Sequence, residues 1–222
     1  MITRSSQLIS NFNVRAGSKL SLNGFYAFES ARSNTDGAGS FPANQYDLST
    51  EYGRAGFDVR HRVQFNGSWS PKWGLRFSPF VTLASGRPFN IITGSDLNHD
   101  GLYTDRPAFG SAVRTPFGAF DPAPTAGETI IPRNYGHGPG LLAVNLRVAK
   151  TITLREPPDG KKGEPLQLVL SLNARNVLNH PNFAAPDGNL SSPLFGQSTA
   201  LVNSGGGAYG TRRLDLQIRF EF

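Results

Sequence analysis

The most distinct spacing of metal-ligating side chains in this sequence lies between positions 96 and 107. Side-chain oxygens stand at the first, third, fifth and tenth positions of this segment, on Asp96, Asn98, Asp100 and Asp105. With Gly101 at the sixth position, the segment begins like a calcium loop, because glycine permits the sharp turn that closes such a loop. The bidentate Glu expected at position twelve is replaced by Pro107. The segment is therefore either a partial calcium loop or a polar turn rich in Asp, Asn and Gly.

Residues for other chemistries are missing or badly spaced. The chain has no cysteine, which excludes disulfides, thiolate zinc sites and cysteine nucleophiles. The four histidines are not spaced as metal ligands are; they are His61, His99, His137 and His180. Neither a P-loop nor a nucleophile elbow is present. We therefore expect no enzymatic activity and no cofactor, calcium excepted.

The charge balance argues against a nucleic-acid partner. The formal net charge is +6, which suits anionic partners, but only 17% of residues are charged and no block of Lys or Arg occurs. Gly and Pro are abundant, at 25 and 16 residues, so long helices are not expected. Apolar residues nevertheless recur in regular segments, which excludes a disordered chain.

That recurrence has a period of two, which predicts strands with one polar and one apolar face. The predicted strands are Leu8–Ala16, Lys19–Phe28, His61–Trp69, Leu75–Leu83, Leu142–Leu154, Leu166–Arg175 and Arg212–Phe222. Lys150 is the only charged residue in an apolar register, and we expect it to reach toward a membrane interface. Pro79 cannot donate a ladder hydrogen bond, so we expect a bulge or a local break there.

The lengths of these strands and of their connections favour a membrane barrel over a soluble sandwich. The strands run to about nine to thirteen residues, whereas soluble strands average about 5–6 and a tilted bilayer crossing needs about 9–11. Long loops, near 30–60, 84–141 and 177–211, alternate with shorter turns, as in outer-membrane barrels. Aromatic residues mark both ends, with Trp69, Trp73, Phe220 and Phe222 near the short turns and Tyr26 and Phe28 near the long loops.

The predicted fold is therefore all-β, an antiparallel up-and-down transmembrane β-barrel segment of about seven strands in contact with outer-membrane lipid. Small barrels have even strand numbers, and open sheet edges are costly in lipid. No signal-peptide pattern is visible either. We accordingly expect residues 1–222 to form a single C-terminal segment of a larger barrel in the bacterial outer membrane.

Seven arginines fall on the polar side of the predicted strands: Arg15, Arg62, Arg76, Arg147, Arg175, Arg213 and Arg219. If this side lines a lumen, it favours anionic solutes. The alternative is that the arginines pair with carboxylates of a plug and of neighbouring strands.

Several strings of residues resemble TonB-dependent receptors, and within them the subgroup with a carboxypeptidase-regulatory-like N-terminal domain. They are Asp47–Arg54, Asp58–Arg62, Ser85–Asn90, Asp96–Pro107, Asn173–Phe183, Leu190–Gly196 and the terminal strand Arg212–Phe222. Together they extend the resemblance over roughly residues 45 to 222.

This resemblance implies a plugged barrel of about 22 strands that takes up a scarce nutrient. The unknown nutrient would be a small molecule or an oligomer, such as a saccharide, a peptide or a metal chelate. Uptake would be driven by the TonB complex through an N-terminal part that this sequence lacks, while this chain supplies barrel wall and extracellular loops. Phe222 resembles the C-terminal signal read by the barrel assembly machinery. The alternative function is a non-transporting cell-surface adhesin or a calcium-stabilised glycan-binding β-protein.

Overall fold

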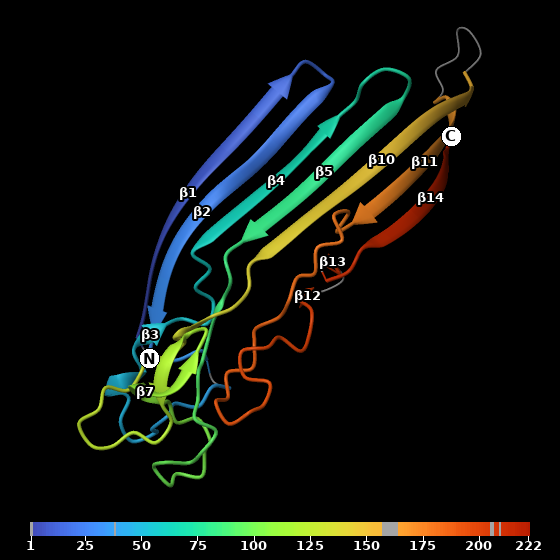
Figure 1. Ribbon diagram of the computed structural model, residues 1–222. Helices are drawn as coiled ribbons and strands as arrows, with labels where there is room; N and C mark the ends of the chain where they lie inside the picture. Colours follow the sequence, from blue (N-terminus) through green and yellow to red (C-terminus); the bar gives the residue numbers. More distant parts are fainter. Residues whose placement is uncertain (1, 38, 157–163, 205–206, 209) are drawn as a thin grey trace.

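The structure is a computed structural model that describes residues 2–37, 39–156, 164–204, 207–208 and 210–222. Seven long strands form one antiparallel sheet and pair in chain order (Figure 1). They are β1 (Thr3–Ala16), β2 (Leu20–Ser33), β4 (His61–Trp69), β5 (Leu75–Ala84), β10 (Leu141–Arg155), β11 (Leu166–Arg175) and β14 (Arg213–Glu221). The seven predicted strands are therefore confirmed. Part of the predicted turn at 155–165 lies outside the described residues.

The predicted alternation of turns and loops is also confirmed. The turns after β1 and β4 lie at one end of the sheet, the short-turn end, and the long connections gather at the other, the long-loop end (Figure 1). Strands β1 and β2 continue about five residues beyond the predicted bounds, with Thr3 paired to Ser33. Their extension lacks apolar alternation, because backbone pairing persists where the side chains no longer need a lipid-facing pattern.

The apolar face of the sheet is uncovered. Leu8 is 65% exposed on β1 and Leu216 is 74% exposed on β14. The other sheets among the described residues are two-stranded and belong to the loops. A soluble sandwich would bury this face against a second sheet, so the sandwich alternative is wrong. The described sheet is not closed, since β1 and β14 are its two edge strands.

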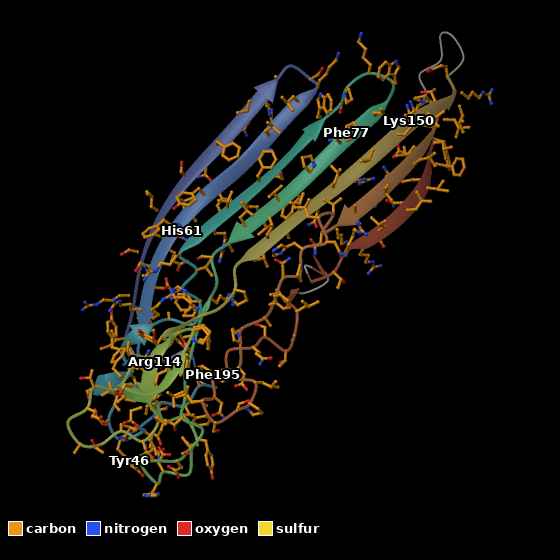
Figure 2. The ribbon with its side chains drawn as sticks, in the orientation of Figure 1. Tyr46, His61, Phe77, Arg114, Lys150 and Phe195 are labelled. Carbon is orange, nitrogen blue, oxygen red and sulfur yellow. The ribbon has the colours of Figure 1, made fainter. Side chains whose placement is uncertain are left out.

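Aromatic side chains mark both ends of the sheet as predicted. At the long-loop end the Tyr26 hydroxyl lies 2.9 Å from Nδ1 of His61, and the Phe28 ring centroid is 5.4 Å from that of His61. At the short-turn end the Trp69 and Phe77 rings stack with centroids 5.4 Å apart (Figure 2). Lys150 reaches this end too, where its ammonium donates to the carbonyl of Trp73.

Pro79 interrupts one ladder without shifting its register. Strand β5 runs unbroken through Pro79, which pairs with Leu146 of β10. On the β4 side, the pairing omits the positions of Gly67 and Ser68 and resumes at Trp69 in the same register. The predicted local break is therefore present as a gap in the β4 ladder, and it fits the missing N–H of proline.

The described parts of 34–60, 85–140 and 176–212 fold together into what we call the loop layer. Its short elements are the 3-10 helix η1 (Ser49–Glu51) and the strands β3 (Gly53–Arg54), β6 (Pro88–Phe89), β7 (Ala108–Thr115), β8 (Gly118–Asp121), β9 (Gly136–His137), β12 (Asn203–Ser204) and β13 (Gly207–Ala208). No helix in the described part of the chain is long and apolar enough to cross a membrane.

The loop layer has a hydrophobic core of its own. Phe89, Ile91, Phe120 and Ile131 are buried together, and Leu190 and Phe195 of the third loop pack against them. Backbone hydrogen bonds join the same two loops, since Ile92 donates to the Gly188 carbonyl and accepts from the Leu190 N–H. The second and third loops are thereby held as one unit over the end of the sheet.

Candidate functional site

All seven predicted arginines lie on the polar face of the sheet. The strand pairing sets Arg15 opposite Ser21, Arg62 opposite Ala27, Arg76 opposite Ala149, Arg147 opposite Asn173, Arg175 opposite Arg213 and Arg219 opposite Val169. The strand residues of this face include three carboxylates, those of Glu29, Asp215 and Glu221. Seven guanidinium groups against three carboxylates leave a net charge of +4, so the face is basic.

Some of these arginines pair with a neighbouring carboxylate, and others do not. Asp215 lies 2.9 Å from Nε of Arg213 and 3.7 Å from Nη2 of Arg175, and Arg219 and Glu221 are 2.5 Å apart. Arg147 donates to the Ser171 hydroxyl at 3.4 Å. Within the described residues, four of the seven form no ion pair, namely Arg15, Arg62, Arg76 and Arg147. Their charges are therefore available to an anion.

Amide side chains cross the same face between the arginines. Asn13, Asn23 and Asn66 are register partners on adjacent strands β1, β2 and β4. They border a hollow of about 370 Å³ together with Asn11. Amides both donate and accept hydrogen bonds, so they suit hydroxyl-rich solutes. This row was not among the predicted site residues, although asparagines recur in the polar registers of the sequence.

A cavity of about 610 Å³ lies where the polar face meets the loop layer, and we call it the junction cavity. The wall contributes Arg62, Thr82 and Ala84, and the loops contribute Arg87, Phe183 and Leu201. Of the seven predicted arginines, Arg62 is the one that lines this cavity. The cavity thus combines an unpaired wall arginine and a loop arginine with apolar side chains.

A buried ion pair connects two loops of the loop layer. Nη1 of Arg106 lies 2.8 Å from Oε1 of Glu51, and both side chains are 2% exposed. Arg106 also donates to the carbonyl oxygens of Thr50 and Ile131. The pair therefore connects the first loop to the second. The sequence did not reveal it, because the two residues are far apart in the chain.

A buried carboxylate, that of Asp58, anchors the first loop. Asp58 accepts from the Ala31 N–H at 3.0 Å and from Nε of Arg54 at 2.7 Å. Burial raises the pKa of Asp58, but the N–H of Ala31 and the guanidinium of Arg54 outweigh it, and the pKa lies below its ordinary value.

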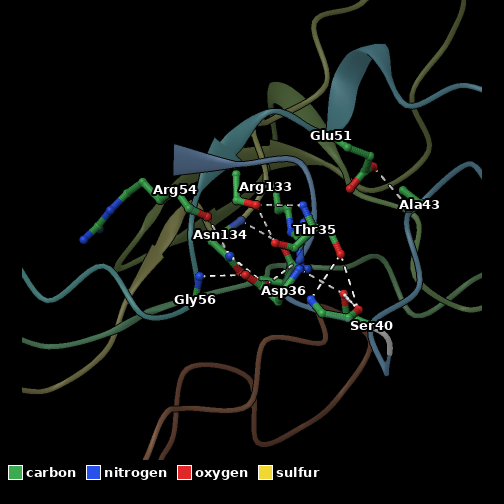
Figure 3. A network of polar contacts seen from close by, with 12 residues as sticks. Thr35, Asp36, Ser40, Ala43, Glu51, Arg54, Gly56, Arg133 and Asn134 are labelled. Carbon is green, nitrogen blue, oxygen red and sulfur yellow. Dashed lines mark hydrogen bonds and ion pairs between the residues drawn. The ribbon is translucent and has the colours of Figure 1, made fainter. Parts of the chain in front are cut away.

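Asp36 joins the first loop to the second from another side. Its carboxylate lies 2.5 Å from Nη2 of Arg133 and accepts from the Gly56 N–H and from Nδ2 of Asn134 (Figure 3). Asn134 also donates to the carbonyl oxygen of Arg54. These contacts make the base of the loop layer a connected polar network.

The four predicted calcium ligands lie in one turn, where backbone N–H groups donate to their side-chain oxygens. Asp96 accepts from the N–H groups of Asp100 and Gly101, and Asp105 accepts from that of Leu97 at 2.7 Å. Asn98 and Asp100 likewise accept from backbone N–H groups within the loop. Among the described residues, no group of three His, Cys, Asp or Glu is placed to hold a metal. These hydrogen bonds account for the turn and favour the polar-turn alternative over the calcium loop.

The histidines and the C-terminal Phe222 occupy separate places. His61 begins β4, His99 lies in the 96–105 turn and His137 lies in β9, where its Nε2 is 3.2 Å from Nη1 of Arg54. Burial, reinforced by the charges of Arg54 and Arg60, lowers the pKa of His137. Phe222 is exposed just beyond β14, and its role as an assembly signal stays a prediction.

Comparison with known proteins decides the family. A family model described as an outer membrane beta barrel domain matches residues 7–215. The chain belongs to this outer membrane β-barrel family. The family places it in the bacterial outer membrane. No characterised protein and no solved structure was found to match it.

Because the chain is an outer membrane β-barrel domain, the environment of each face of the sheet can be assigned. The apolar face meets the hydrocarbon of the membrane, and the polar, arginine-bearing face lines the lumen side. The long-loop end is the extracellular end, since barrels of this kind carry their long loops outside. The junction cavity therefore lies on the lumen side, beneath extracellular loops.

Proposed function

We propose that this outer membrane β-barrel domain binds and takes up an anionic, hydroxyl-bearing nutrient in the manner of TonB-dependent receptors. The observation that carries the proposal is the unpaired Arg62, which lies on a basic lumen-side wall and opens into the junction cavity beneath the loop layer. The domain supplies wall and loops, and no catalytic step is part of its role.

The lining of the junction cavity indicates the chemistry of the solute. Arg62 and Arg87 offer planar guanidinium groups that bind carboxylate or phosphate in a bidentate way. Phe183 offers an apolar surface beside them, and the asparagine row below offers donors and acceptors for hydroxyl groups. Acidic saccharides, acidic peptides and carboxylate-bearing metal chelates share these features.

The uptake proposal includes a larger barrel around this sheet. Strands β1 and β14 each leave one edge without a described partner strand. In lipid, every unpaired backbone group costs several kcal/mol, so both edges must be paired in the membrane. We propose that further strands of the same protein pair them and surround a plug that engages the TonB complex.

Binding is tested first with the chain in detergent micelles. The probes are tri-galacturonic acid, which is anionic, and maltotriose, which is neutral. We expect the anionic sugar to bind more tightly, and Arg62→Gln with Arg87→Gln to abolish that preference. Arg114→Gln, at an exposed position of β7 outside the cavity, is the matched control. Equal binding of both sugars by the unaltered chain would remove the proposed anion site.

Transport is tested in the native host. Accumulation of the labelled anionic sugar should require the TonB complex, whereas its binding at the cell surface should not. Accumulation that persists without the TonB complex would reject TonB-dependent uptake and leave the binding result standing.

A second candidate is a non-transporting surface protein that binds glycans. It is favoured by aromatic side chains exposed on the loop layer, among them Phe41, Tyr46 and Tyr103, with Tyr46 88% exposed at the end farthest from the sheet (Figure 2). Exposed aromatic rings are suitable platforms for sugar rings. In that case Tyr46→Ala with Tyr103→Ala would abolish glycan binding, and no accumulation would occur.

A further inference from the structure

Three arginines stand side by side on the outer face of the sheet at its extracellular end. Arg4 of β1 is the register partner of Arg32 of β2, and Arg32 is the partner of Arg54 of β3. Partners in a ladder point to the same face, about 4.8 Å from strand to strand. Their face is the apolar one, since Leu8 and Phe28 are paired four residues along the same two strands. We call these residues the outer arginine row.

The outer arginine row lies just beyond the aromatic band. Arg32 is four residues from Phe28, which corresponds to about 13 Å along the strand. With a strand tilt of about 40°, this is about 10 Å along the membrane normal. Ser6 and Ser30 form the single pair between the two levels. The face therefore changes from apolar to basic at the depth of the lipid headgroups.

Two of the three charges of this row are not balanced by a carboxylate of the described residues. Within the described residues, neither Arg4 nor Arg32 forms an ion pair, and both are exposed. Like charges directly opposite each other in a ladder repel and destabilise the pair. Arg54 differs, since Asp58 lies 2.7 Å from its Nε. An anion placed between Arg4 and Arg32 would relieve the repulsion.

A hollow of about 530 Å³ adjoins the row. Arg32, Arg54, Arg60 and Arg133 line it, together with His137 and Tyr135. Two carboxylates, Asp58 and Asp36, pair with three of these arginines, so four positive and two negative charges leave a net charge of +2. Arginines in such an arrangement match the oxygens of a phosphate group.

We propose that the outer arginine row and this hollow bind the phosphate groups of an anionic lipid in the outer leaflet of the membrane. A lipid, and not free phosphate, is indicated because the arginines continue into the apolar face. The exposed side chains of Leu8 and Phe28 lie below the arginines, beyond the single Ser6–Ser30 pair, and seat an acyl chain while the arginines hold the headgroup. The outer arginine row lies on the face opposite the lumen, and the hollow shares no lining residue with the junction cavity.

The experiment uses the 222-residue chain in neutral detergent micelles. Diphosphorylated lipid A is titrated in, with its phosphate-free form and inorganic phosphate as parallel probes, and the thermal unfolding midpoint and the lipid adduct in native mass spectra are recorded. We expect the diphosphorylated lipid alone to raise the midpoint and to form a one-to-one adduct. Added salt should weaken this binding, because the arginines are exposed.

The variant Arg4→Gln with Arg32→Gln should weaken lipid binding by about tenfold for each arginine removed. Both side chains are exposed, and their removal relieves repulsion, so the midpoint without lipid should stay the same or rise. Arg15→Gln with Arg76→Gln removes the same charge from the opposite face and should bind lipid as the unaltered chain does.

Three results would overturn the proposal, and two of them need no variant. One is equal stabilisation by the phosphate-free lipid, which would make the contact purely apolar. Another is stabilisation by inorganic phosphate at the same concentration, which would make this an ion site. The third is loss of binding in the Arg15→Gln, Arg76→Gln control to the same extent as in the Arg4→Gln, Arg32→Gln variant, which would reduce the effect to net charge.

Discussion

Replacement of Glu51 by alanine should open the loop layer while the sheet stays folded. Glu51 and Arg106 are both 2% exposed, and their charged atoms are 2.8 Å apart. Without the carboxylate, the Arg106 guanidinium stays buried with only the carbonyl oxygens of Thr50 and Ile131 as partners. Breaking a buried pair in this way costs about 3–5 kcal/mol. The loss should be local, since the pair connects two loops and no long strand.

Limited proteolysis and hydrogen exchange of the chain in micelles measure this effect. In Glu51→Ala, cleavage and exchange should rise within the loop layer and stay unchanged in strands such as β10 and β11. The matched control is Asp215→Ala, which breaks the more exposed pairs with Arg213 and Arg175 and should cost about 0–1 kcal/mol. The double change Glu51→Leu with Arg106→Met removes both charges and should recover much of the lost protection.

Two results would refute this reasoning. If Glu51→Ala and Asp215→Ala caused the same small loss of protection, burial would not be what makes the Glu51 pair strong. If the double change were no better protected than Glu51→Ala, the cost would come from lost packing and not from an unpaired charge.

Three further outcomes are expected. Leu216→Arg should destabilise the sheet in lipid vesicles by about 2–4 kcal/mol in urea unfolding, whereas Gln217→Arg on the polar face should cost little. The pKa of Asp58 in the folded protein lies below its ordinary value of 3.8, so the ionised carboxylate contributes its full stabilisation of the loop layer above pH 3.8 and loses it as the pH falls through the lower folded pKa. Pepsin cleavage of the loop layer should rise over that pH range. Asp58→Asn should remove this pH-dependent rise. Millimolar calcium should leave the thermal midpoint unchanged, because backbone N–H groups already occupy the loop oxygens; a rise that Asp96→Asn abolishes would instead establish a calcium loop.

The seven long strands could be predicted because lipid imposes its pattern on every strand in the same way. Each strand had to place apolar side chains at alternate positions, and β4 and β11 have the predicted bounds, His61–Trp69 and Leu166–Arg175. Strands β1 and β2 were predicted too short, because the pairing continues to Thr3 and Ser33 outside the bilayer, where the side chains do not alternate between apolar and polar. The calcium loop stays a prediction, and the sequence could not show that N–H groups of the same turn occupy the oxygens of its candidate ligands.

The sheet, its two faces and its short-turn and long-loop ends could be predicted from local patterns, because a period of two is a local property of the chain. The same patterns also assigned the seven arginines to the polar face. Which of these arginines lines a cavity depends on the fold of the loops, which places Arg87 and Phe183 in the same cavity lining as Arg62. The ion pair between Glu51 and Arg106 depends on the tertiary structure in the same way, and so does the alignment of Arg4, Arg32 and Arg54 in one row. These contacts join distant parts of the chain, and no local periodicity encodes them.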